Sequence, residues 1–97
     1  MKNDDLNIIF DIKKKQKKIK KEINKKIFIQ CKNTIILHAK NNKTECFFKI
    51  PFFIFGLPKY DVKYVSDYII YKLNKFSIKK VLFFEPNIIY IDWSDLS

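Results

Sequence analysis

The chain of 97 residues contains no arginine, so all 20 of its basic side chains are lysines. The formal net charge of +10 favours partners with negative surfaces: nucleic acid, anionic lipid or acidic protein. Because lysine offers a point charge rather than a bidentate fork, we expect any nucleic-acid binding to be salt-sensitive and weakly sequence-specific. The abundant Lys, Ile, Asn, Phe and Tyr have codons rich in A and T, so base composition is an alternative source of part of this charge.

Glycine and histidine each occur once and cysteine twice, which removes several classes of site. One glycine cannot form a glycine-rich phosphate loop. The spacing of Cys31 and Cys46 fits no zinc motif, and no further cysteine or clustered histidine completes a tetrahedron. We therefore predict no metal and no cofactor. The two thiols are predicted to be free and partly buried, with a disulfide or a reactive thiol as alternatives.

No nucleophile–base pair can be placed in the sequence. His38 is the sole imidazole and is expected on the inward side of a helix, in a structural role. The ten carboxylates are scattered, and Asp61 and Asp67, six residues apart on a predicted helix, do not share a face. The sequence therefore predicts that the protein is not an enzyme.

Long hydrophobic runs are also missing. The longest uncharged run, residues 50–58, has nine residues including two prolines, whereas a spanning helix needs about 20 apolar residues. The sequence therefore predicts no spanning membrane segment. The early acidic residues and the lack of an apolar h-region predict no signal peptide.

Residues 3–40 are predicted to form one long helix. Apolar or small residues recur close to helical spacing, at positions 9, 12, 19, 23, 27, 31, 35 and 38–39. Its cap candidates are Asn3, Asp4 and Asp5 at the start and the left-handed stop Asn41-Asn42 at the end. At 1.5 Å per residue the helix is about 55 Å long, so its first half is expected to project. A strand is the alternative for residues 27–37, where β-branched residues are dense.

Residues 13–26, the lysine segment, carry nine lysines and one glutamate. We divide the chain into a Lys-rich projecting half, residues 1–26, and a compact α+β domain, residues 27–97. The candidate phosphate contacts are Lys13, Lys14, Lys17, Lys18, Lys20, Lys21 and Lys25. The alternatives are a solvated helix with a narrow contact stripe, an anionic membrane surface, and a short coiled coil. Positions 9, 12, 16, 19 and 23, the apolar seam, fit that coiled coil with Gln16 as a polar break.

The remaining chain predicts strand, helix, strand, strand. The strands are expected at residues 44–50, 77–84 and 88–93. The helix follows Asp61 as N-cap and buries Val62, Val65, Ile69, Leu73 and Phe76, with Asn74 as its left-handed end. The fold class is therefore α+β: a small three-stranded, largely antiparallel sheet with the helices on one face.

Turn residues join these elements. Pro51 is expected to end the first strand, Gly56 to supply a backbone shape that side chains forbid, and Pro58 to fix the next turn. Glu85-Pro86-Asn87 joins the last two strands, where Asn87 tolerates positive φ. Trp93 is expected to cover the edge of the core.

Residues 47–61, FFKIPFFIFGLPKYD, hold six aromatic side chains. We interpret them as filling between sheet and helix, with an exposed partner-binding patch or interfacial lipid contact as alternatives. The five tyrosines, Tyr60, Tyr64, Tyr68, Tyr71 and Tyr90, are likewise interpreted as packing residues, although they could stack nucleic-acid bases.

Residues 31–93 resemble small uncharacterised proteins of the nucleocytoplasmic large DNA viruses, the mimivirus-like giant viruses. The similarity runs from a helix with Cys31, through a Cys-aromatic strand, to a Gly-x-Pro-x-Tyr-Asp turn and a terminal aliphatic-x-Trp. The matching positions are Cys31, Cys46, Pro51, Gly56, Pro58, Tyr60, Asp61, Tyr68, Ile69, Leu73, Phe76, Pro86, Asn87, Ile91 and Trp93. Lys75 stands where the family has glycine, so Asn74 is expected to shape that turn.

The resemblance brings no known activity or catalytic residue. It implies a viral protein made in host cytoplasm, at the viral factory, or carried in the virion. The leading hypothesis is a non-enzymatic viral accessory or virion-associated protein that contacts a viral or host protein. The alternative is a nonspecific nucleic-acid-binding protein that uses the lysine segment, and a peripheral membrane protein is a third possibility. The oligomeric state does not follow from the sequence.

Overall fold

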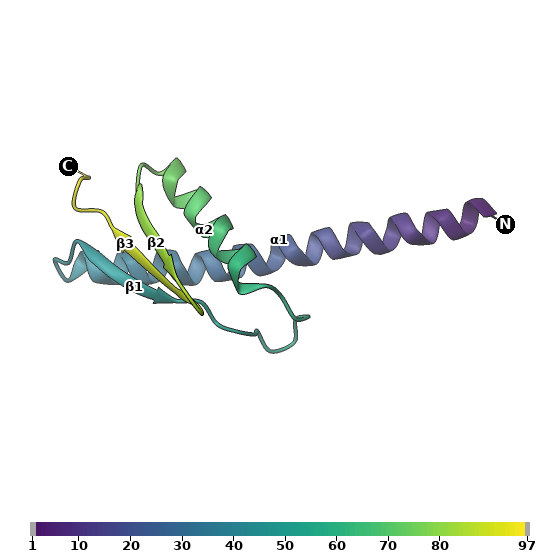
Figure 1. Ribbon diagram of the computed structural model, residues 1–97, viewed down its shortest axis with the longest axis horizontal. Helices are drawn as coiled ribbons and strands as arrows, with labels where there is room; N and C mark the ends of the chain where they lie inside the picture. Colours follow the sequence, from purple (N-terminus) through teal and green to yellow (C-terminus); the bar gives the residue numbers. More distant parts are fainter. Residues whose placement is uncertain (1, 97) are drawn as a thin grey trace.

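The computed structural model describes residues 2–96, with side chains described from Leu6 onward. The elements follow the order α1 (Lys2–Lys40), β1 (Glu45–Lys49), α2 (Val62–Lys75), β2 (Lys80–Phe84) and β3 (Ile88–Asp92) (Figure 1). The predicted α+β order is confirmed, and residues 27–37 are helical rather than extended. The cap candidates Asn3, Asp4 and Asp5 lie outside the described side chains.

Helix α1 ends where the asparagine pair predicted a stop. Asn42 adopts a left-handed φ of 63°, which asparagine tolerates better than most residues. The turn is closed by hydrogen bonds from Asn41 N and Lys43 N to the His38 carbonyl, at 3.0 and 2.9 Å. The chain therefore reverses and delivers β1 alongside the second half of α1.

The three strands form an open antiparallel sheet in the order β1-β3-β2. Strand β3 pairs with both neighbours, with Ile91 opposite Cys46 on one side and opposite Val81 on the other. Because β1 and β2 both run antiparallel to β3, they run parallel to each other. Helix α2 is therefore the crossover of a split β-α-β unit whose gap is filled by β3.

The core lies between one face of the sheet and the two helices. Alternate strand residues, including Cys46, Phe48, Val81, Ile89 and Ile91, are buried on the inner face. Helix α1 contacts β1, α2 contacts β2, and the two helices contact each other. Burying each aliphatic side chain stabilises the folded state by about 1.5–3 kcal/mol, so this one layer provides most of the favourable free energy of folding.

Helix α2 buries the face that its spacing predicted, with one exception. Val65, Ile69 and Leu73 are buried and Val62 is partly buried, but Phe76 is 61% exposed because the helix ends at Lys75. The left-handed residue after the helix is Ser77, with φ 67°, and not Asn74 as predicted. Ile78 N closes the end on the Leu73 carbonyl at 3.0 Å, as expected for a left-handed helix stop.

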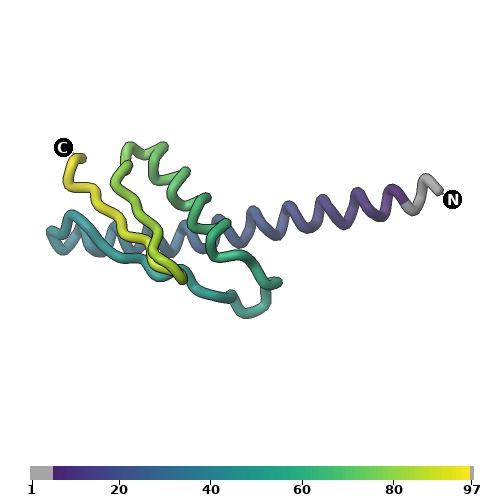
Figure 2. Tube along the Cα trace, in the orientation of Figure 1, coloured from purple at the N-terminus to yellow at the C-terminus, as the bar shows by residue number. Residues whose placement is uncertain are grey.

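The first half of α1 runs beyond all other elements. The molecule measures 62 × 25 × 22 Å, and Figure 2 shows the purple part of the helix clear of the remaining trace. Along α1, burial starts with partly covered Ile19 and is complete at Ile23. The division at residues 26 and 27 stays a prediction. Among the described residues, no helix has the length and apolarity to cross a membrane.

Candidate interaction surfaces

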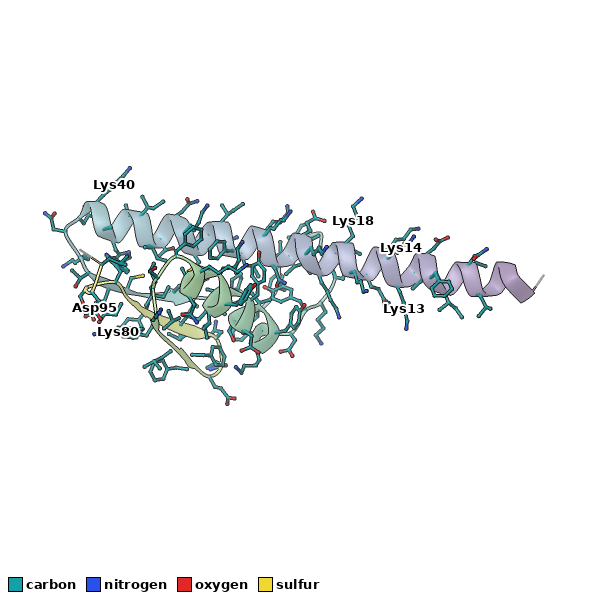
Figure 3. The ribbon with its side chains drawn as sticks, turned by 90° about the horizontal axis from the view of Figure 1, so that it is seen from above. Lys13, Lys14, Lys18, Lys40, Lys80 and Asp95 are labelled. Atoms are coloured by element: carbon teal, nitrogen blue, oxygen red, sulfur yellow. The ribbon has the colours of Figure 1, made fainter. Side chains whose placement is uncertain are left out.

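The lysine segment lies on α1 where the helix leaves the domain. All seven candidate phosphate contacts are exposed, and Figure 3 shows Lys14 and Lys18 extending from one side of the helix and Lys13 from the other. The ion pairs of the described residues are Lys63–Asp67 and Lys80–Asp95, so no lysine of this segment is paired with a described carboxylate. The lysines therefore surround the helix as unneutralised positive charge.

The apolar seam interrupts this charge on one side of α1. Ile23 packs in the core and Ile19 is partly covered, whereas Ile9 and Ile12 are 51% and 49% exposed. At 3.6 residues per turn these positions stay on one side of the helix. The surface that packs on the domain therefore continues outward without a partner. Phe10, 62% exposed, lies about 200° around the helix from Ile12.

A groove of about 730 Å³ marks the place where the seam leaves the domain. Ile19 and Ile23 line it on one wall, and Pro58, Tyr60 and Tyr64 line it on the other. Lys20 lies over the Tyr64 ring at 5.8 Å from the centroid, which holds this lysine stem against the groove. The groove is thus mainly apolar, and its charged lining residues are Lys20, Lys59 and Asp61.

The turn from Pro51 to Asp61 is held by contacts at its two ends. The Tyr60 hydroxyl donates to the Pro51 carbonyl, and burial raises the pKa of Tyr60 above its usual value. Gly56 has φ +86°, which side chains rarely adopt, although a Cβ there would meet no neighbour. Gly56 is therefore required by backbone shape rather than by space.

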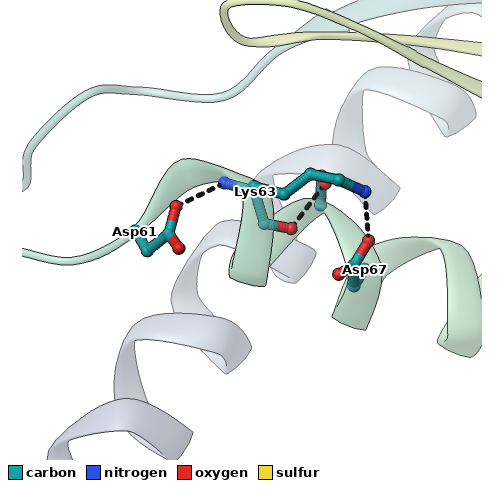
Figure 4. A network of polar contacts seen from close by, with 4 residues as sticks. Asp61, Lys63 and Asp67 are labelled. Carbon is teal, nitrogen blue, oxygen red and sulfur yellow. Dashed lines mark hydrogen bonds and ion pairs between the residues drawn. The ribbon is translucent and has the colours of Figure 1, made fainter.

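Asp61 starts α2 in the way its position predicted. Its carboxylate accepts a hydrogen bond from the Lys63 backbone N–H at 3.0 Å, and the Lys63 ammonium reaches Asp67 at 2.6 Å (Figure 4). The N-cap satisfies one free amide and places negative charge at the positive end of the helix dipole. The exposed Lys63–Asp67 pair adds little stability. Asp61 and Asp67 are separated by this lysine and form no acid–base pair.

The interpretation of residues 47–61 as core filling is wrong for most of the aromatics. Phe48 is buried and Tyr60 is partly buried. Four phenylalanines are exposed by at least half of their surface: Phe47, Phe52, Phe53 and Phe55. Two helices cover only one face of the sheet, so outward-pointing Phe47 has nothing above it.

Phe47 belongs to a larger apolar surface that the sequence reasoning missed. We define the outer sheet face as residues 45, 47 and 49 of β1, 80, 82 and 84 of β2, and 88, 90 and 92 of β3. Leu82 and Phe84 are exposed by 56% and 49%, and the Phe47 and Tyr90 rings stand 5.2 Å apart. Strand alternation was the available signal for this surface.

Asn87 joins the β2–β3 turn to the end of β1. Its side-chain amide donates to the Ile50 carbonyl at 2.8 Å, and Ile50 N donates to the Asn87 carbonyl, also at 2.8 Å. Asn87 is 4% exposed, and it has no positive φ. Asn87 thus acts through its side chain, next to Pro86. Trp93, partly buried, donates its backbone N–H to the Thr44 carbonyl at the other end of β1.

The tyrosines are not brought together on one surface. Tyr68 packs edge-on against Phe28 at 6.2 Å, whereas Tyr64 and Tyr71 are about half exposed on α2. The Tyr90 hydroxyl donates to Glu45 and Asp92, and the hydrogen bond to Glu45 is the main cause of its raised pKa. Negative charge beside Tyr90 disfavours a phosphate at this ring.

Cys31 and Cys46 are free, as predicted, and both are buried rather than partly buried. Burial, and secondarily the neighbouring Cys46, raises the pKa of Cys31 from 9.0 to about 12. Burial raises the pKa of Cys46 to about 11. Since the thiolate is the reactive form, neither sulfur is primed for nucleophilic chemistry. His38 is half-buried, and its Nδ1 lies 2.8 Å from the Thr34 carbonyl within α1.

Asn24 is a buried polar residue, and its position among lysines gave no reason to predict its burial. It is 5% exposed, and its Oδ1 has no hydrogen-bond partner among the described atoms. An unpaired buried acceptor destabilises the fold. No group of three or more potential metal ligands occurs within residues whose side chains the structure describes.

Comparisons with known proteins identify relatives but no activity. The model of a family of unknown function, DUF5759, matches residues 5–74. An uncharacterised protein of Acanthamoeba polyphaga mimivirus is 40% identical over 78 residues, which cover 77% of this chain and 63% of the length of that relative. No solved structure matches the chain. Because the family model covers more than half of the chain, the protein belongs to DUF5759, an uncharacterised family with a giant-virus member.

Proposed function

We propose that this protein is a non-enzymatic viral accessory or virion-associated protein that acts through protein–protein contacts. Its place of action is the host cytoplasm, at the viral factory, or the virion. The observation that carries the proposal is the apolar seam: Ile9 and Ile12 are half exposed on the side of α1 that packs on the domain at Ile23. A viral or host protein that covers this side would bury both isoleucines.

The partner is expected to carry an apolar strip flanked by acidic side chains. Full burial of a large aliphatic side chain stabilises a contact by about 1.5–3 kcal/mol, so two half-exposed isoleucines provide a useful but modest anchor. The unpaired lysines around the seam would add attraction and faster association with an acidic surface. The groove at Ile19 offers a concave surface, next to the domain, in which one end of such a partner could pack.

The test is crosslinking mass spectrometry in infected cells, comparing the natural protein with the Ile9→Glu/Ile12→Glu variant. We expect crosslinks from the projecting half to one viral or host protein, and their loss in the variant. Phe10→Glu is the control, because it also replaces an exposed apolar side chain with a carboxylate, about 200° around the helix from Ile12. Retained crosslinks in the seam variant, or equal losses in both variants, would contradict docking on the seam.

Nucleic-acid binding is the second candidate function, supported by the unpaired lysines. Each neutralised phosphate lowers the logarithm of the binding constant by about 0.7–0.9 per tenfold increase in salt. Binding should therefore collapse with salt and disappear when Lys13, Lys14, Lys17, Lys18, Lys20 and Lys21 are changed to Gln. Filter binding to single- and double-stranded DNA measures both effects. Retention that survives high salt and all six substitutions would eliminate this candidate.

Vesicle flotation separates both candidates from membrane-surface binding. A peripheral role predicts retention on vesicles that contain anionic lipid and none on neutral vesicles. Equal retention on both vesicle types, or retention on neither, counts against binding to an anionic membrane surface.

A further inference from the structure

The charged and apolar groups of the outer sheet face are arranged so that two copies of the face are complementary to each other. Its middle row consists of Phe47, Tyr90 and Leu82, paired across β1, β3 and β2. Phe47 is 64% exposed and Leu82 is 56% exposed, so the row offers apolar area that the domain leaves uncovered. Figures 1 and 3 show α1 along one side of the sheet, and that inner side is the one the helices contact.

The two rows beside the middle one differ in charge. One consists of Glu45, Asp92 and Lys80, and the other of Lys49, Ile88 and Phe84. On β1 the face is therefore negative at one end and positive at the other. The Tyr90 hydroxyl holds Glu45 and Asp92 in place by donating to both, and Lys80 reaches Asp95 at 3.2 Å.

We propose that the outer sheet face binds the same face of a second copy of this chain. The two-fold axis runs across the strands, through the middle row. This rotation places β1 over β1 and reverses its direction, so Glu45 faces Lys49 of the partner subunit, twice per dimer. It also places the Lys80 stem against Phe84 of the partner subunit, so that the ring packs on the apolar part of the lysine.

Charge selects this axis over the other two-fold axis. Rotation about an axis along the strands would also bring Glu45 opposite Lys80 of the partner subunit, but it would place Asp92 directly against its own equivalent. Such a like-charge juxtaposition is unfavourable, especially once water is excluded. With the cross-strand axis, Asp92 lies away from its equivalent and keeps its hydrogen bonds from Tyr90 and from Ser94 N, the latter at 2.8 Å.

The same charges argue against nucleic acid on this face. Exposed aromatic side chains on a small sheet could stack bases, but phosphates next to them would meet Glu45 and Asp92. The face also carries Lys49 and Lys80, but Lys80 is paired with Asp95, and the dense run of lysines that would attract phosphates lies elsewhere, on the projecting half of α1. A second copy is therefore the occupant that the face fits best.

The size of the face predicts a weak dimer. Three strands spaced about 4.8 Å apart, each of five residues at about 3.4 Å, cover a flat area of about 240 Å². This area does not count the extra surface of side chains that stand above the sheet. Stable interfaces bury about 800 Å² per partner, so dissociation should be visible at ordinary laboratory concentrations. This inference is independent of the proposed function, since a monomer would still expose the apolar seam.

Sedimentation equilibrium of the full chain over a range of concentrations tests the dimer. We expect a monomer–dimer equilibrium that Phe47→Glu weakens at least about 30-fold, as for loss of an aromatic hot-spot residue. Leu37→Glu is the control, since Leu37 is 60% exposed on α1, and should leave association unchanged. Circular dichroism confirms that both variants remain folded.

A charge exchange tests the axis. Glu45→Lys alone and Lys49→Glu alone should each weaken the dimer, because like charges then face each other across the interface. The double variant restores opposite charges and should associate more tightly than either single variant. The proposal would be overturned if the chain stayed monomeric at all concentrations, or if Phe47→Glu left the dimer affinity unchanged. It would also be overturned if the double variant bound no more tightly than the single variants. Loss of the dimer in Ile12→Glu, with Phe47→Glu unaffected, would instead assign self-association to the seam.

Discussion

Raising the pH should destabilise this protein through Cys31. The thiol is fully buried on α1, and burial raises its pKa from 9.0 to about 12. In the unfolded chain the same thiol ionises near its ordinary pKa, so alkali releases its proton from the unfolded state first. The stabilising effect of the neutral thiol is complete below about pH 9 and is lost as the pH rises toward about 12.

The magnitude follows from the two pKa values. At pH 10 an unfolded thiol with a pKa of 9.0 is present in about a tenfold ratio of thiolate to thiol, whereas the buried thiol remains neutral. This ratio lowers the free energy of the unfolded state by about RT ln 11, or about 1.4 kcal/mol. Cys46, with its pKa raised to about 11, acts in the same direction.

The assay is urea unfolding at pH 8 and pH 10, under reducing conditions, for the natural protein and Cys31→Ala. Both proteins share all other ionisable groups, so the effects of those groups cancel in the difference. Cys31→Ala will have its own cost at both pH values, which also cancels. We expect the natural protein to lose about 1.4 kcal/mol more than the variant. Identical losses would refute the assignment of a neutral buried thiol.

Substitutions at three positions test other parts of the fold by urea unfolding. Asp61→Ala should lower the free energy of unfolding by about 1 kcal/mol through loss of the N-cap to Lys63 N, whereas Asp61→Asn, which also caps, should cost much less. Asn87→Ala should cost about 1–3 kcal/mol because it leaves the Ile50 carbonyl without its side-chain donor; an unchanged midpoint would contradict that bond. Asn24→Leu should be neutral or stabilising, because Oδ1 has no partner; a large loss would reveal one.

The order and type of the elements followed from local chemistry. Helical spacing predicted α1, the asparagine pair predicted its end, and Asp61 predicted the start of α2, because these signals act within a few residues. The turn at Pro86 was located in the same way. Its tertiary role was not, since the bond from Asn87 to Ile50 joins positions 37 residues apart. Local patterns carry no information about such a pairing.

The exposed aromatics were missed because their burial depends on how many layers the fold has. The sequence predicted both helices on one face, but residues 47–61 were still interpreted as filling between sheet and helix, although such an arrangement leaves the other face open. Phe47 and Phe48 illustrate the consequence: neighbouring, chemically identical residues are 64% and 6% exposed. Asn24 shows the reverse case, a polar residue within the lysine segment that tertiary packing buries.

The two proposed surfaces lie on separate parts of the molecule, and this has a consequence for affinity. A dimer formed through the outer sheet faces would leave both projecting halves of α1 free, so each assembly would present two apolar seams. Two linked sites bind a repeated partner, such as a surface with many equivalent subunits, with an avidity about 10²–10⁴ above that of one site. Phe47→Glu should therefore keep single-site affinity for an isolated partner subunit but lose this gain on an array, as measured by biosensor binding at low and high partner density. If Phe47→Glu left both measurements unchanged while abolishing the dimer, the two surfaces would act without reference to each other.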